Sequence, residues 1–121
     1  MSEVPVPAED TPVPGRSVRG SQTGRPIMAA FDLLGRRWAL RILWELRDGP
    51  VGFRALQQKC GDVSPTVLST RLGELRSAGL VEHDPNKAQR LTPLGQDLRQ
   101  ALVPLQDWAE RWAKTSSDSP T

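Results

Sequence analysis

Residues 63–93 read VSPTVLSTRLGELRSAGLVEHDPNKAQRLTP, and the predicted architecture rests on this segment. Ser64 followed by Pro65 predicts a helix start, because a serine oxygen can accept an unpaired backbone N–H and proline has none to satisfy. Three leucines then recur at the spacing of one helical face, at Leu68, Leu72 and Leu75. Gly79 is typical of a helix end. We therefore expect a helix over residues 65–78 with one apolar face.

Two short runs with strand character follow this helix, at residues 80–83 and 89–91. They flank residues 84–87, whose sequence DPNK suits a tight hairpin turn. Thr92 and Pro93 repeat the capping pattern and predict one more helix. Its apolar residues follow the heptad spacing that is typical of a seam between two helices, at Leu94, Leu98, Ala101, Leu105, Trp108 and Trp112.

Three shorter helices are predicted before this stretch. Pro26 starts the first, which stops at Gly35. The second is centred on Ile42 and ends before the turn DGP, and the third covers residues 52–59. The fold class is therefore mainly α with a small β-hairpin. This order of elements is that of a winged helix-turn-helix, with N- and C-terminal helices available for dimerisation.

The length and composition indicate one soluble globular domain and argue against a membrane, fibrous or multidomain protein. The chain has 121 residues, enough for one domain, and its 37% hydrophobic and 25% charged residues are typical of a soluble globular protein. We expect a flexible Pro/Gly-rich tail over residues 1–25, a folded domain over 26–114 and a disordered polar tail over 115–121. Without a membrane span or a signal sequence, the expected location is the cytoplasm.

Candidate catalytic and metal-binding residues are scarce. Cys60 and His83 are single residues of their types, which excludes an internal disulfide framework and the usual zinc sites. Neither paired carboxylates nor a phosphate-binding glycine loop is present, so we expect no enzyme, no metal and no cofactor. Cys60 occupies an apolar position and is expected to be buried and inert.

At these residues the chain resembles the HxlR family of winged-helix regulators. The matching segments are LLGRRW (33–38), ILWEL (42–46), DGP (48–50), FRAL (53–56), VSPTVLS (63–69), RLGEL (71–75), AGLV (78–81), LTPLG (91–95) and DWA (107–109). The resemblance implies a homodimer, formed by the first and last helices, that binds promoter DNA as an activator or a repressor. Two departures are visible. Arg25 stands where many members have a sensing cysteine, and Gln89 stands in a short wing where a tyrosine is usual.

The candidate DNA contacts lie on the 65–78 helix, on the helix before it, on the wing, and at the start of the second helix, which Arg36 and Arg37 open. Thr66, Thr70, Gly73 and Ser77 share the face opposite Leu68, where hydroxyl groups could reach base edges. The full set of candidates is Arg36, Arg37, Arg54, Lys59, Ser64, Pro65, Thr66, Ser69, Thr70, Gly73, Arg76, Ser77, Lys87 and Arg90. The alternative for the face is an ordinary solvated surface, and for each basic residue a solubilising charge. For Arg71, a structural ion pair and a DNA contact are equally supported.

The candidate dimerisation residues come from the first and last helices: Ile27, Phe31, Leu98, Leu105, Trp108 and Trp112. Packing within one chain is the alternative, but it would leave much of so long a terminal helix exposed. The predicted partners are double-stranded DNA and a second copy of the chain, with a small-molecule effector left open. A winged-helix module for protein partners, with weak or no DNA binding, is the alternative function.

Overall fold

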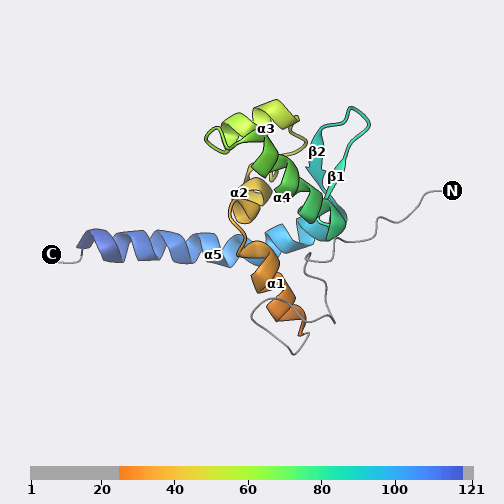
Figure 1. Cartoon of the computed structure of the whole chain (residues 1–121). Helices are drawn as coiled ribbons and strands as arrows, with labels where there is room; N and C mark the ends of the chain where they lie inside the picture. The colour runs from red at the N-terminus through yellow and green to blue at the C-terminus, as the bar shows by residue number, and fades with distance from the viewer. Residues whose placement is uncertain (1–24, 119–121) are drawn as a thin grey trace.

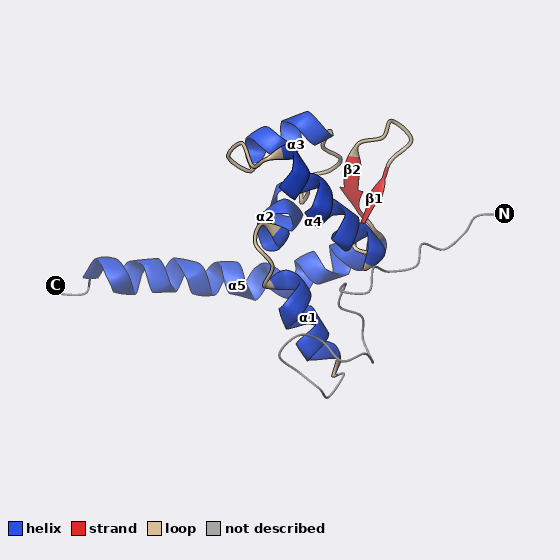
Figure 2. Cartoon of the chain, viewed as in Figure 1, coloured by secondary structure: helices blue, strands red, loops and turns tan. Residues whose placement is uncertain are grey.

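The computed structural model describes residues 25–118. Residues 1–24 and 119–121 lie outside the described residues, so the tail expected over 1–25 is represented only by Arg25. The chain forms five helices and one hairpin within the described range (Figures 1 and 2). They are α1 (Pro26–Leu34), α2 (Ala39–Glu45), α3 (Phe53–Lys59), α4 (Pro65–Ser77), β1 (Val81–His83), β2 (Gln89–Leu91) and α5 (Pro93–Asp118). The predicted class, mainly helical with a small β-hairpin, is confirmed.

The core gathers around α2, which the apolar faces of α3 and α4 cover. Its fully buried aliphatic side chains are Ile42, Leu46, Leu56, Leu68, Leu72 and Leu75. All three leucines predicted for one face of α4 are in this set, so the opposite face of α4 is turned outward. Val81 and Leu91 extend the same core into the hairpin. The packing therefore holds α3 and α4 as one unit (Figure 1).

The hairpin forms the wing of the fold. Its antiparallel register pairs Val81 with Leu91, Glu82 with Arg90 and His83 with Gln89. The extended stretch before α3 also joins it, since the N–H of Val51 donates to the Gln89 carbonyl at 2.9 Å and the reverse bond has the same length. In the turn, the Asp84 carboxylate accepts bonds from the backbone N–H groups of Asn86 and Ala88. These bonds shape a short, ordered wing.

Helix α5 has two parts with different surroundings. Near its start, Leu98 is half-buried and packs against the core. This residue of the predicted dimer seam therefore makes its apolar contacts within its own chain. From Val103 to Thr115 every residue is exposed, and Figure 1 shows this part extending away from the rest of the molecule. The helix continues to Asp118. This corrects the expectation that a disordered tail begins at residue 115, and Thr115 Oγ1 donates to the Arg111 carbonyl at 3.0 Å.

Cys60, at the end of α3, is 1% exposed. Burial raises the pKa of its thiol above the ordinary value, against a smaller opposing effect of Arg41. Because the thiolate is the reactive form, we expect an aromatic disulfide reagent at pH 8 to react roughly 100-fold more slowly with the native chain than with the chain in denaturant. Absorbance of the released thiolate measures both rates. Equal rates would contradict the burial of Cys60.

Candidate nucleic-acid interface

The outward face of α4 is most exposed to solvent in the first half of the helix. Thr66, Ser69 and Thr70 are exposed there, and their spacing places them on one side of the helix. Gly73, one turn further on, has open space around the position that a Cβ would occupy. This half of α4 therefore presents short hydroxyl side chains and a bare backbone, with no bulky or acidic group on the exposed face.

The start of α4 suits a phosphate. The Ser64 hydroxyl accepts a bond from the Val67 N–H at 3.1 Å, which confirms the predicted cap, and Pro65 occupies the first position of the helix. The remaining N–H groups of the first turn point outward along the helix axis, where the helix dipole favours an anion. Ser64 and Pro65 are both exposed, so a DNA backbone could approach this end.

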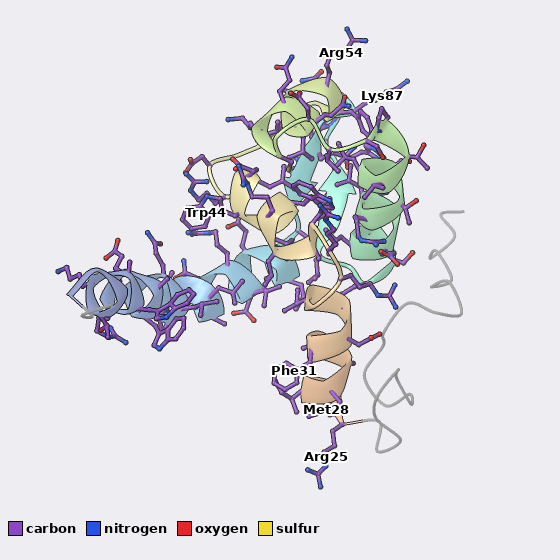
Figure 3. All side chains as sticks on the ribbon, turned by 60° about the vertical axis from the view of Figure 1, so that its left-hand side comes forward. Arg25, Met28, Phe31, Trp44, Arg54 and Lys87 are labelled. Atoms are coloured by element: carbon purple, nitrogen blue, oxygen red, sulfur yellow. The ribbon has the colours of Figure 1, made fainter. Side chains whose placement is uncertain are left out.

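Two basic residues lie at the same end of the molecule. Arg54 projects from α3 and Lys87 from the tip of the wing, and Figure 3 shows both pointing outward. Both are exposed. A backbone φ of 65° at Lys87 belongs to the tight turn that places this side chain at the tip. We call the exposed half of α4 together with Arg54 and Lys87 the α4 surface. Asp62, an exposed carboxylate, lies in the turn just before α4.

Arg36, by contrast, belongs to the interior. Its guanidinium pairs with Glu74 of α4 and, at 3.2 Å, with Asp32 of α1, and its side chain is only 13% exposed. Arg71 completes the cluster, with one bond to Glu74 at 2.9 Å and another to the Arg37 carbonyl at 2.8 Å. We therefore correct the expectation that Arg36 contacts DNA. Of the two alternatives for Arg71, a structural ion pair and a DNA contact, the structure has the ion pair, with Glu74.

Other candidates lie beside the α4 surface or away from it. Arg76 is half-buried and donates to the Gln89 side chain of the wing at 3.1 Å, and burial lowers the pKa of its guanidinium. Arg90 pairs across the hairpin with Glu82 at 2.8 Å, both side chains being about two-fifths exposed. Ser77, at the far end of α4, lines a pocket with α1 and α5.

Two further basic candidates remain at the surface. Arg37 is exposed, with its guanidinium carbon 5.4 Å from the centre of the Trp38 ring. Lys59 is exposed at the end of α3, where its carbonyl accepts a bond from Arg41 at 2.7 Å. The structure neither brings these two residues onto the α4 surface nor buries them.

Sequence reasoning missed two side chains that matter to the arrangement. Gln89 is 4% exposed, and its contact with Arg76 ties the wing to α4. Asp97 on α5 faces the pocket that Ser77 also lines. A buried glutamine among strand residues carries no local signal, because its partner lies 13 residues away on another element.

Comparison with known proteins agrees with this arrangement. Residues 33–117 match the HxlR-like helix-turn-helix family, which is most of the described chain. The chain belongs to this family. The HTH-type transcriptional regulator Rv3095 of Mycobacterium tuberculosis is 35% identical over 103 residues, which cover 80% of this chain and 65% of that protein. This chain therefore spans just under two thirds of the length of that relative.

Other relatives are matched over more of their length. The HTH-type regulator YodB of Bacillus subtilis is 33% identical over 92 residues, covering 71% of this chain and 82% of that protein. The crystal structure of quinone-bound YodB superposes with a TM-score of 0.65 at 34% identity, over 71% of this chain and 97% of YodB. An HxlR family factor from Thermoplasma volcanium gives 0.64 at 27% identity, over 74% and 85% of the two chains. The winged-helix fold of this HxlR-like chain is thus the fold of its family.

Two negative findings concern the described residues alone. Between residues 25 and 118, no group of three or more histidine, cysteine, aspartate or glutamate side chains is arranged to hold a metal ion. In the same range, no helix combines the length and the apolar character that crossing a membrane requires.

Proposed function

We propose that this HxlR-like chain is a homodimeric transcription regulator that binds duplex DNA by placing α4 in the major groove. The observation that carries the proposal is the α4 surface, with Thr66, Ser69 and Thr70 exposed on α4. The exposed cations Arg54 and Lys87 project from α3 and from the tip of the wing (Figure 3). Hydroxyl groups can bond to base edges, while the flanking cations neutralise phosphates. Because the side chains on this face are small, the helix backbone can also approach the floor of the groove closely.

The long α5 supports the dimer. Its second half leaves large apolar side chains in contact with solvent: Leu105 at 48%, Trp108 at 49% and Trp112 at 60% exposed. On α1, Ile27 and Phe31 are also more than half exposed. A second copy that covers these surfaces would present two α4 helices, and such helices read half-sites about 34–36 Å apart.

The triple variant Arg54→Ala, Thr66→Ala, Thr70→Ala tests the DNA contacts. We expect affinity for DNA upstream of the chain's own gene to fall about 100-fold or more, since each lost base or phosphate contact costs roughly 1–3 kcal/mol. The slope of log affinity against log salt should fall by about two, one for each Arg54 of a dimer. Fluorescence anisotropy between 50 and 200 mM salt measures both quantities.

Lys114→Ala is the charge-matched control, because this exposed lysine lies on α5, outside the α4 surface. It should leave DNA affinity unchanged. Undiminished binding by the triple variant would contradict the contact assignment. If the unaltered chain shows no salt-dependent binding to its upstream DNA, the winged-helix module for protein partners becomes the better explanation.

A further inference from the structure

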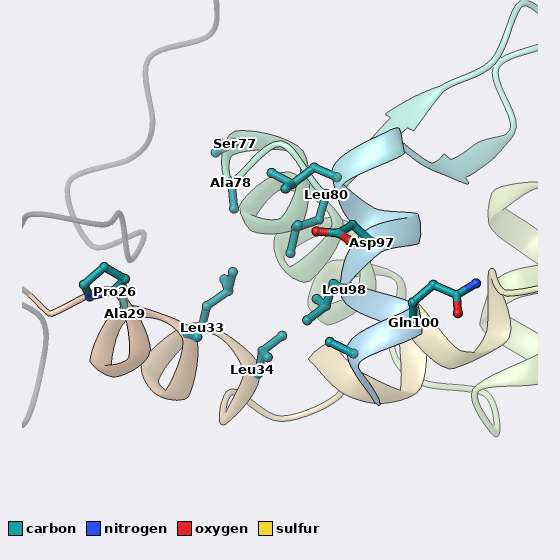
Figure 4. A pocket seen from close by; sticks show the side chains of 13 residues that line it. Pro26, Ala29, Leu33, Leu34, Ser77, Ala78, Leu80, Asp97, Leu98 and Gln100 are labelled. Carbon is teal, nitrogen blue, oxygen red and sulfur yellow. The ribbon is translucent and has the colours of Figure 1, made fainter. Parts of the chain in front are cut away.

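A pocket lies between α1, the end of α4 and the first turns of α5. Its volume is about 680 Å³, within the range of roughly 300–1,000 Å³ of small-molecule sites. Most of its lining is aliphatic, with alanine and leucine side chains from α1, from α5 and from the residues that follow α4 (Figure 4). The pocket could therefore bury a compact hydrocarbon group.

Asp97 is the one charged residue of this lining. Figure 4 shows its carboxylate pointing from α5 toward the end of α4, beside Leu80, while the amide of Gln100 points the other way. Within residues 25–118 the Asp97 carboxylate has no ion-pair or side-chain hydrogen-bond partner, in contrast to Asp32 and Glu74. Asp97 is exposed, so its carboxylate lies at the open side of the pocket. The pocket thus combines an aliphatic wall with one unpaired, solvent-accessible negative charge at its edge.

The pocket uses a different face of α1 from the one offered to a second copy. Ala29 and Leu33 line it and are buried, whereas Ile27 and Phe31 are exposed and do not line it. Figure 3 shows Phe31 projecting away from the α1 ribbon into open space. Trp108 and Trp112 are also absent from the lining. Leu98 is the one dimerisation candidate that lines the pocket, and it packs against the core of its own chain. The exposed apolar residues offered to a second copy are therefore separate from the pocket lining.

We propose that this pocket binds a small organic cation, a protonated amine on a compact aliphatic body. The hydrocarbon part displaces water from the alanine and leucine wall, and the ammonium group donates to the Asp97 carboxylate. A charge-assisted hydrogen bond in a partly apolar site is stronger than a neutral one, so the carboxylate selects cations over neutral molecules of the same shape. The proposal does not depend on DNA binding, and its test contains no DNA.

Isothermal titration of the full chain with 1-adamantylammonium tests the proposal, with adamantane-1-carboxamide and adamantane-1-carboxylate as neutral and anionic probes of the same body. We expect one cation to bind per chain, about tenfold more tightly than the amide, and the carboxylate to bind more weakly still. Asp97→Asn should reduce the affinity for the cation by about tenfold and leave that for the amide unchanged.

Asp107→Asn is the matched control, because it removes a carboxylate from the same helix outside the pocket. It should leave all three affinities unchanged. Equal affinities for the three probes, or cation binding unaffected by Asp97→Asn, would overturn the proposal. So would an absence of binding at millimolar probe, or binding that weakens as protein concentration rises, since residues 1–24 or a second copy would then be the occupant.

Discussion

Replacing Gly95 with alanine is expected to lower the free energy of unfolding by about 3 kcal/mol or more. Gly95 is buried in the first turns of α5, and a Cβ there would lie 2.1 Å from the Leu80 carbonyl oxygen. That oxygen is backbone and already accepts the Thr92 N–H at 3.0 Å. The added methyl group must therefore push α5 away from the loop between α4 and β1, which would disturb core packing on both sides.

Denaturant unfolding at one fixed protein concentration measures this effect, because stability of a dimer depends on concentration. Gly73→Ala is the matched control, since nothing lies within 4 Å of a Cβ at that position in α4. Alanine there should raise stability by about 0.5–1 kcal/mol, the ordinary gain over glycine inside a helix. A Gly95→Ala chain as stable as the unaltered one would show that α5 does not pack this closely on Leu80.

The double variant Trp108→Ala, Trp112→Ala is expected to raise the dissociation constant of the dimer about 1,000-fold or more, because buried interface tryptophans typically contribute at least 2 kcal/mol each. The two rings stack, with centroids 5.4 Å apart and planes inclined by 21°, on a stretch of α5 with no other apolar cover among the described residues. No residue of the same chain between positions 25 and 118 buries them, so we expect a partner chain to cover them. Sedimentation velocity measures the dimer directly.

DNA binding should weaken together with dimerisation, since a monomer reaches one half-site instead of two. Glu110→Ala is the control, because residue 110 lies on the opposite side of α5 from the tryptophans and is exposed. It should leave both the dimer and the DNA affinity unchanged. A double variant that still sediments as a dimer would place the interface elsewhere, with α1 the next candidate.

Local patterns predicted most of the candidate interface. Ser64 and Pro65 start α4, and the leucine spacing decides which side of it is buried, so the outward position of Thr66 and Thr70 follows from the sequence. Arg36 could not be assigned in this way. Its partner Glu74 is 38 residues away along the chain. The local sequence around an arginine before a helix is the same whether its side chain faces solvent or pairs with a buried carboxylate.

The order and type of the elements follow from local sequence, because capping residues, turn residues and apolar spacing act within a few positions of the chain. The tertiary structure was needed to show which polar side chains form ion pairs inside the molecule, as Arg36 and Arg71 do. It was also needed to show which apolar side chains stay exposed to solvent. Leu98 packs on its own core while Trp108, in the same heptad seam, lies beyond the end of that core. The physical reason is that burial depends on what lies opposite a side chain in space, and helical periodicity gives only its direction.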